Sequence, residues 1–260
     1  MTVKDIFNSL NERAPVVLKM DFDNVGHLAG REGAEVSTVL VALDITDEVI
    51  DEAAAMGAEL IVSHHPLIFG SVKSATDADL TGRKLVALLS RGMSAICMHT
   101  NLDAAQGGVN DALASALGAR VTGILNREEG ISRTAELEGE VPFSQFLRSV
   151  STALGAAGVR YAGPERPVRR IGLCGGAGAG DMLLAWERGC DTYVTADVKH
   201  HEFIAANELG LNLIDAGHFP TENVVVPVLA AWLRADHPGL KVYESSRCRQ
   251  PERFYMCDRS

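Results

Sequence analysis

Four short segments of this chain bring together the residue types that bind transition-metal ions. Neutral imidazoles with carboxylates suit Zn, Fe or Mn, whereas Ca and Mg sites are built from oxygen ligands. The segments are His64-His65, His99 to Asp103, Asp197 to His201, and His218 to Glu222. Each follows an apolar run typical of a buried strand, and ligands in open α/β sheets collect beyond the carboxyl ends of strands. One such cluster is weak evidence, but their recurrence at successive strand ends predicts a metal site.

Each of these clusters also has an ordinary structural explanation. Adjacent strand residues point to opposite faces, so His64 and His65 can share a site only where the strand ends, as Pro66 requires. Otherwise they are hydrogen-bonded residues at the edge of a core. Asp103 could instead cap the helix that follows it. Glu222 lies in the first turn of an expected helix, where a carboxylate also suits the helix dipole.

Two further segments could contact a ligand. The loop Asp21 to Gly26 could do so through Asn24, or could be a simple Asx turn. The glycine-rich segment 172–181 could hold an anion with backbone N–H groups. It lacks the spacing of a dinucleotide fingerprint and the lysine of a P-loop, so a close strand–helix turn is the favoured interpretation. The cluster from Asp197 to His201 is expected to line the pocket or relay protons, although a histidine there could also lie on a helix surface.

The elements that must position these residues alternate between strands and helices. The run Val39–Leu43 indicates a strand, Thr46 a helix cap, Met56-Gly57 the end of that helix, and Leu60–Ser63 a second strand. The same pattern predicts strands at Val86–Leu89, Ala95–Met98, Ile171–Cys174, Thr192–Thr195 and Leu211–Asp215. This alternation predicts an α/β fold with mostly parallel sheets flanked by helices.

The chain is expected to form two related α/β lobes with the metal site in the cleft between them. Residues 39–63 and 171–195 align without gaps, although any two strand–helix–strand units match this well. The charged segment 125–141 indicates a boundary, after which Pro142 opens a helix. We therefore predict one lobe from residues 1–125 and 218–260 and a second from 126–217.

Composition limits the partners and the compartment. The 260 residues carry a formal net charge of −10, which argues against nucleic-acid binding but not against a small anionic ligand beside bound cations. No apolar run approaches the roughly 20 residues of a membrane span, and the N-terminus predicts an amphipathic helix instead of a secretory signal. The five cysteines are scattered and are expected to be packed free thiols. A cytoplasmic protein without membrane contact is expected.

Five segments, in order and spacing, resemble the GTP cyclohydrolase I type 2 homologues, also called the Nif-three-like dinuclear metal centre proteins. They are DFDNVGHLAG, LIVSHHPLIF, HTNLDAAQGGVNDALA, TADVKHHEFIAA and IDAGHFPTE, which lie between about residue 20 and residue 230. The S-H-H-P and G-H-x-x-T-E motifs are the most specific. Two positions depart from the family pattern: Phe22 replaces a tryptophan and His27 a leucine, both in the loop expected to face substrate.

The resemblance implies a ligand set and an assembly. It implies that two divalent metal ions per chain, of Zn, Fe or Mn, are held by His64, His65, Asp103, His218 and Glu222. Glu222 would bridge both ions. It also implies a two-lobed α/β fold and a toroidal homohexamer. Longer members carry an inserted domain, for which this chain is too short.

The family name implies hydrolytic opening of the imidazole ring of GTP to give formate and dihydroneopterin triphosphate. Two cations lower the pKa of a shared water, and His99 or His201 could act as general acid or base. The local positive charge would attract a small anionic substrate such as a nucleotide. The same residues would also suit a phosphoesterase or an amidohydrolase on another substrate. A hexameric metal-binding or regulatory protein without turnover is the alternative from a different class.

Overall fold

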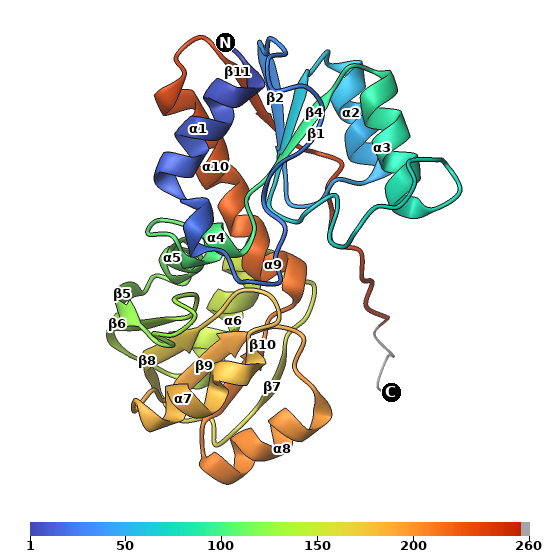
Figure 1. Ribbon diagram of the computed structural model, residues 1–260. Coiled ribbons are helices and arrows are strands. Elements are labelled where there is room, and N and C mark those ends of the chain that lie inside the picture. Colours follow the sequence, from blue (N-terminus) through green and yellow to red (C-terminus); the bar gives the residue numbers. More distant parts are fainter. Residues whose placement is uncertain (256–260) are drawn as a thin grey trace. The chain divides into compact units, whose positions relative to one another are not determined.

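The computed structural model describes residues 1–255, which divide into two compact units. The first unit comprises residues 1–108 and 225–249, and the second comprises residues 109–224 and 250–255. Each unit has its own sheet with flanking helices (Figure 1). The division after Gly108 and before Val225 differs from the expected boundaries at 125 and 218, because the segment 109–125 supplies a helix and a strand of the second unit.

The first unit contains a five-stranded sheet in the order β1-β4-β3-β2-β11. Its strands are β1 (Gly26–Ala29), β2 (Thr38–Ala42), β3 (Leu60–Ser63), β4 (Ser94–Cys97) and β11 (Lys241–Glu244). Its helices are α1 (Val3–Arg13), α2 (Asp47–Ala55), α3 (Leu80–Ser90), α4 (Thr100–Ala104) and α10 (Val226–Asp236), with a 3-10 turn η1 (Val16–Leu18). Strands β11, β2, β3 and β4 run parallel, and only the edge strand β1 is antiparallel. The expected mostly parallel sheet is thus found in this unit.

Helices cover both faces of this sheet. Figure 1 shows α1 and α10 on one side of the strands and α2 and α3 on the other. The expected N-terminal helix is α1, which begins with a capping box in which the Thr2 and Asp5 side chains each accept the other residue's backbone N–H. Thr46 caps α2 by accepting the N–H of Val49, and Gly57 follows the helix in the left-handed region.

The prediction of one strand in this unit, at Val86–Leu89, is wrong. Residues Val86–Leu89 lie inside helix α3, whose first turn is capped by the Asp79 carboxylate accepting the Gly82 N–H at 2.8 Å. Leu85 and Leu88 are buried against β2 and β3, whereas Val86 and Leu89 are exposed. This spacing is helical, and a run of four apolar residues alone cannot separate the two conformations.

The second unit contains a six-stranded sheet in the order β5-β6-β8-β9-β10-β7. Its strands are β5 (Arg120–Ile124), β6 (Arg133–Val141), β7 (Arg160–Ala162), β8 (Val168–Leu173), β9 (Thr192–Thr195) and β10 (Asn212–Asp215). Its helices are α5 (Val109–Ala116), α6 (Phe143–Leu154), α7 (Met182–Glu187), α8 (His200–Leu209) and α9 (His218–Glu222), with 3-10 turns η2 (Ala179–Asp181) and, at the unit boundary, η3 (Asn223–Val225). One hydrophobic core lies between the sheet and helices α5 and α6, and another involves α7 and α8.

This second sheet is mixed, not mostly parallel. Strands β8, β9 and β10 are parallel, but β5, β6 and β7 pair antiparallel to their neighbours. Strand β6 lies in the charged segment that we interpreted as a boundary. Its alternation of buried Ala135 and Leu137 with polar residues is the strand signal that the high charge concealed. The helix expected after Pro142 is present as α6.

The two expected repeat segments have the same local topology. Strands β2 and β3 are parallel neighbours joined through α2, and β8 and β9 are parallel neighbours joined through α7. In both units the second strand of this motif leads directly into a polar cluster, His64-His65 after β3 and Asp197 after β9. Each unit therefore presents its chemistry at the carboxyl edge of its own sheet.

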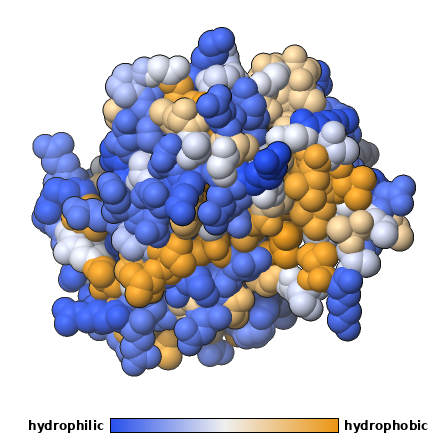
Figure 2. All heavy atoms as spheres, turned by 45° about the horizontal axis from the view of Figure 1, so that its top comes forward, coloured by the Kyte–Doolittle hydropathy of each residue, from blue (hydrophilic) through white to orange (hydrophobic). Residues whose placement is uncertain are grey.

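The remaining composition-based expectations concern thiols and membranes. Cys97, Cys174, Cys190 and Cys248 are free thiols, and the first three are buried, as expected; Cys257 lies outside the described residues. None of the helices within residues 1–255 is long and apolar enough to cross a membrane. On the face seen in Figure 2, hydrophobic residues form patches among hydrophilic ones.

Candidate metal centre

His64 is the most deeply buried member of the candidate site. It follows β3, and its side chain is fully buried. Its Nδ1 lies 2.9 Å from the carbonyl oxygen of Met98, so the ring donates that N–H to the backbone and its Nε2 faces Asp103. Met98 in turn donates its N–H to the Ser63 carbonyl at 2.9 Å, which continues the pairing of β3 and β4. The ring is therefore fixed by the sheet itself.

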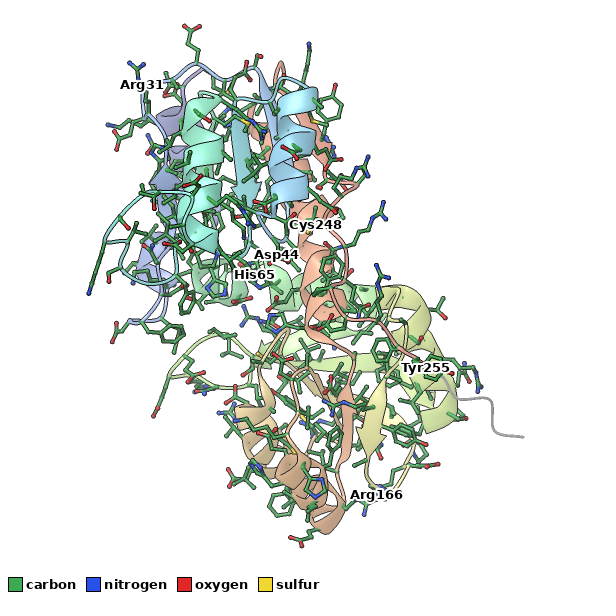
Figure 3. All side chains as sticks on the ribbon, turned by 90° about the vertical axis from the view of Figure 1, so that its right-hand side faces the viewer. Arg31, Asp44, His65, Arg166, Cys248 and Tyr255 are labelled. Carbon is green, nitrogen blue, oxygen red and sulfur yellow. The ribbon has the colours of Figure 1, made fainter. Side chains whose placement is uncertain are left out.

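His65 is oriented by a carboxylate from the neighbouring strand end. Its N–H donates to the carbonyl of Leu43 at 2.9 Å, and its Nδ1 lies 2.7 Å from Asp44 Oδ1. Figure 3 shows Asp44 and His65 side by side, with Cys248 close to Asp44. The Cys248 sulfur accepts the backbone N–H of Asp44 at 3.4 Å, so the C-terminal part of the first unit contacts the backbone of Asp44. Strand β3 ends at Ser63, so both histidines follow it and can share a site, as expected; their ring centroids lie 5.0 Å apart.

His99 is held in the same manner by Asp23. Its Nδ1 lies 2.8 Å from Asp23 Oδ1, while the backbone and hydroxyl of Thr100 both donate to Asp23 Oδ2. Burial alone would raise the pKa of Asp23, but the hydrogen bonds from His99 and Thr100 outweigh it and hold this pKa well below its usual range. Asp23 is therefore a permanent carboxylate at neutral pH.

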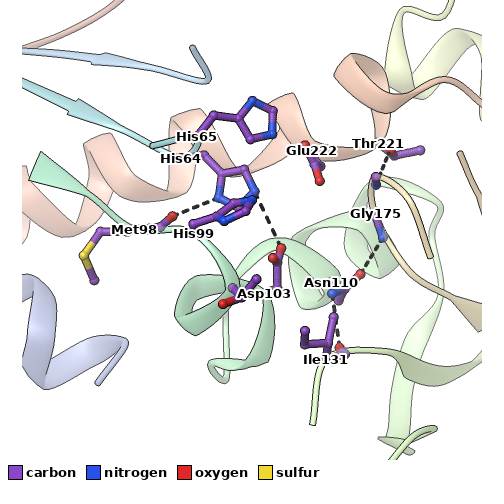
Figure 4. A network of polar contacts seen from close by, with 12 residues as sticks. His64, His65, Met98, His99, Asp103, Asn110, Ile131, Gly175, Thr221 and Glu222 are labelled. Carbon is purple, nitrogen blue, oxygen red and sulfur yellow. Dashed lines mark hydrogen bonds and ion pairs between the residues drawn. The ribbon is translucent and has the colours of Figure 1, made fainter. Parts of the chain in front are cut away.

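These side chains form one cluster, defined here as the first-unit cluster: His64, His65, His99 and Asp103. Each of the three histidines offers a ring nitrogen within 4.8 Å of those of the other two, close enough to hold a metal ion. Asp103 Oδ1 lies 3.7 Å from His64 Nε2, an ion pair drawn as a dashed line in Figure 4. His64 and Asp103 are buried, and His65 and His99 are partly exposed. The donor set of imidazoles with a carboxylate suits Zn, Fe or Mn.

In the second unit, His218 and Glu222 form what we call the second-unit pair. Gly217 has a φ of 87°, which lets the chain turn from β10 into the five-residue helix α9. His218 Nε2 then lies 2.9 Å from Glu222 Oε2, and His218 Nδ1 lies 2.7 Å from Asp197 Oδ2. Burial alone would lower the pKa of His218, but Glu222 and Asp197 raise it to about 9. Glu222 itself is buried, which is unusual for a carboxylate that merely begins a helix.

The glycine-rich segment packs against this pair and does not cradle an anion. The Gly175 N–H donates to Asn110 Oδ1 at 2.8 Å, as Figure 4 shows, and the Gly176 N–H donates to Thr221 Oγ1 at 3.0 Å. The Gly178 N–H donates within the unit as well, to Thr195 Oγ1 at 3.1 Å. A Cβ on Gly176 would stand 2.1 Å from Glu222 Oε1. The favoured prediction of a close turn is therefore confirmed. The turn places the backbone of Gly176 against the Glu222 carboxylate.

Two other expected contributors lie elsewhere in their units. His201 is exposed in the first turn of α8, and among residues 1–255 it belongs to no group of histidines and acids within metal-binding distance. The Asn24 amide donates to the carbonyl of Ile68 at 2.6 Å and so ties two loops together. The catalytic roles expected for His99 and His201 stay predictions.

Sequence reasoning placed Asp23 and Asp197 in segments near the site, but it missed Asp44 and missed that all three orient histidines. Asp44, Asp23 and Asp197 each accept from an Nδ1, and the Met98 carbonyl does so for His64. Metal-binding histidines commonly donate their second ring N–H to a carboxylate or carbonyl. Asp44 could have been found, because it directly follows the apolar run of β2 as His64 follows that of β3. In the structure, Asp197 also has a φ of 53°, a backbone conformation that non-glycine residues seldom adopt.

The fold and these side chains define a class of protein: two α/β units that bear histidine and acid clusters able to bind a metal ion. The family described as Duf34/NIF3 (NGG1p interacting factor 3) matches residues 1–251. The chain belongs to this family, as the motif resemblance implied.

Curated relatives and solved structures agree with this membership. A GTP cyclohydrolase 1 type 2 homolog of Clostridium perfringens is 37% identical over 85% of this chain and 87% of its own length. A protein of the same name from Lactococcus lactis is 31% identical over 98% and 99%. The crystal structure of the Staphylococcus aureus hypothetical protein SA1388 matches with a TM-score of 0.90 and 29% identity, covering 98% of this chain and 99% of that one.

Proposed function

We propose that this protein is a metal-dependent hydrolase with a dinuclear centre. Two divalent ions per chain, of Zn, Fe or Mn, would be held by the first-unit residues His64, His65 and Asp103 together with the second-unit pair. Glu222 would bridge the two ions. The supporting facts are the donor sets within each unit, membership in the family, and the G-H-x-x-T-E motif from which His218 and Glu222 come.

One observation carries the proposal. Four histidines have their Nδ1 committed to an oxygen acceptor: His65, His99 and His218 to carboxylates, and His64 to a backbone carbonyl. This arrangement leaves Nε2 as the nitrogen that His64, His65 and His218 would offer to a metal and that His99 would use for proton transfer, and it increases the basicity of that nitrogen. Histidines that were buried only for packing would not all need to use the same ring nitrogen, Nδ1, for a hydrogen bond to the protein.

The second-unit pair fits a cation on charge grounds as well. The pKa of about 9 means that His218 carries a proton at neutral pH between its Nε2 and Glu222. A divalent ion would take the place of that proton and interact with the same two atoms. Binding would then release a proton, so that metal affinity falls as the pH is lowered.

The residues around the site suit hydrolysis of an anionic substrate. When bound, a pair of divalent ions supplies a water of lowered pKa and a local positive charge. His99, held through Nδ1 by a permanent carboxylate, can accept or donate a proton at Nε2, and His201 is the second candidate for this role. The relatives' name, GTP cyclohydrolase 1 type 2 homolog, supports GTP as substrate. Hydrolytic opening of its imidazole ring would give formate and dihydroneopterin triphosphate.

The test combines metal analysis with turnover. Protein purified without chelator should contain about two transition-metal ions per chain, and it should release formate from GTP. A His64→Ala, His65→Ala double variant should lose both the metal and the activity. His200→Ala, which removes an exposed histidine of α8, is the matched control and should keep both.

The outcomes separate the candidate functions. Absence of bound metal, with no uptake of added Zn, Mn or Fe, would contradict the central claim. Equal formate release by the double variant would reveal a contaminating enzyme. Two tightly bound ions without turnover of GTP or of phosphoester and amide substrates would instead assign a metal-binding or regulatory protein.

A further inference from the structure

Two large aromatic rings are exposed beside the first-unit cluster. Phe22 is 64% exposed and Phe69 is 58% exposed, and their ring centroids lie 6.4 Å apart. The ring of Phe69 also lies 6.3 Å from that of His99, in an edge-to-face arrangement. Exposed apolar side chains that gather next to a polar site commonly mark a binding surface. Neither ring has a role in holding metal.

The chain fixes the position of this pair through three consecutive residues. Phe22 contacts Phe69, Asp23 binds His99 Nδ1, and the Asn24 amide donates to the carbonyl of Ile68. The loop that carries Phe22 is thus tied both to the histidine cluster and to the loop that carries Phe69. The two rings are therefore held in place although they are open to solvent, an arrangement that lowers the entropic cost of binding a ligand.

The surroundings of Phe69 are polar on one side. Phe69 lines a cavity of about 310 Å³ whose other walls include Ser71, Lys73, Ser74, Thr81 and Asp79, whose carboxylate accepts the N–H of Gly82. A volume of this size is at the lower end of the range for small-molecule sites. Hydroxyl groups and a lysine suit the sugar or phosphate part of a ligand, whereas the rings suit a flat apolar surface.

We propose that Phe22 and Phe69 are specificity-determining residues that stack on the planar heteroaromatic ring of the substrate, a purine base. This inference rests on the proposed hydrolytic function, because it places the ring at the metal cluster where it would be opened. Aromatic rings stack on every base through its π-face, so loss of one ring should weaken binding roughly tenfold. A tryptophan at position 22 would offer a similar flat surface.

The experiment measures equilibrium binding of two probes to metal-loaded protein by calorimetry. Guanosine contains the base without phosphates, and inorganic tripolyphosphate contains phosphates without the base. Phe22→Ala, Phe22→Leu and Phe69→Ala should each weaken guanosine binding roughly tenfold and leave tripolyphosphate binding unchanged. Phe22→Trp should retain guanosine binding. Tyr243→Ala is the control, because it removes a partly exposed ring from β11, at the opposite edge of the sheet from β1.

Several results would overturn the proposal. One is unchanged guanosine affinity in both alanine variants, and another is an equal loss for guanosine and tripolyphosphate. Dissociation of an oligomer in sedimentation experiments, with guanosine affinity intact, would show that the pair contacts a second copy of the chain. Failure of the proposed function is a separate result: guanosine binding that depends on both rings, in a protein that releases no formate, leaves the stacking role standing. Conversely, GTP turnover with an unchanged KM in both alanine variants would refute stacking alone.

Discussion

At the scale of single residues, we expect the carboxylates that accept hydrogen bonds from histidines to have the largest effect on stability and metal binding. Asp23 accepts three hydrogen bonds from His99 and Thr100 while almost fully buried. We expect Asp23→Asn to destabilise the protein by about 1–3 kcal/mol at pH 7, because buried donors lose a charged acceptor. Urea unfolding measures this difference, with Asp21→Asn as control, since Asp21 is exposed and lies in the same loop.

The pH dependence of that difference follows from the depressed pKa of Asp23. A carboxyl whose folded pKa lies below its unfolded value of about 3.9 stabilises the fold fully above that pH. The stabilisation is lost as the pH falls through the lower folded pKa. The stability gap between wild type and Asp23→Asn should therefore be constant from pH 7 down to about 4 and shrink below it. A gap that stayed constant at pH 3 would contradict this role.

Glu222 is the residue that separates a metal pair from an ordinary helix start. Glu222→Gln retains the size of the side chain but removes its charge and one anionic oxygen. If Glu222 binds metal, the variant should lose at least one ion while remaining folded. If it serves only the dipole of α9, the change should cost less than about 1 kcal/mol and leave the metal content intact.

The control for this variant is set by the hydrogen bonds of Thr221. Its hydroxyl accepts the Gly176 N–H and contacts the carbonyl oxygens of Gly217 and His218. Thr221→Ser keeps this hydroxyl and should keep both ions. Elemental analysis of the two variants, purified side by side, decides between the two roles, and full occupancy in Glu222→Gln would refute bridging.

At the scale of elements, the glycine-rich turn is as important as the ligands. Gly176 has a φ of 60°, and a Cβ there would collide with the Glu222 carboxylate. We expect Gly176→Ala to displace Glu222, to lower the metal content by about one ion per chain, and to destabilise the fold by about 1 kcal/mol or more. Gly180→Ala in the same segment should do neither, because nothing lies within 4 Å of its added methyl group. Elemental analysis and urea unfolding are the measurements.

Helix α3 offers a test of secondary structure by stability. Leu88 is fully buried and Val86 is exposed, as a helix requires, whereas in a strand these two residues would share one face. Leu88→Ala should cost about 2–5 kcal/mol in the free energy of unfolding. Val86→Ala should change it by less than about 0.5 kcal/mol. Similar losses at both positions would favour the strand that the apolar run suggested.

At the scale of the whole molecule, we predict a closed homohexamer. This prediction follows from the motif resemblance, since closed symmetric assemblies are common but composition does not select six subunits. Light scattering coupled to size exclusion should give six times the chain mass of 27.8 kDa. A monomer at micromolar concentration would contradict it.

The sequence by itself determined the local part of this protein. Strand ends, caps and turns depend on neighbouring residues, so β3 with His64-His65, the Thr46 cap of α2 and the Gly217 turn before His218 could all be predicted. The five ligand candidates also came from sequence, through motifs that keep their residues within a few positions. The same locality explains the error at α3, where four apolar residues fit two conformations.

Only the tertiary structure decided which distant groups orient each histidine. Asp23 and His99 are 76 residues apart, a separation that no local sequence motif spans. Asp44 reaches His65 because β2 and β3 pair in parallel. Gly176 meets Glu222 through the packing of the glycine-rich turn on α9. Such contacts depend on strand order and register, which side-chain periodicity within one segment does not encode. The charged strand β6 is also decided by the tertiary structure, because it becomes part of a sheet by pairing with β5 and β8.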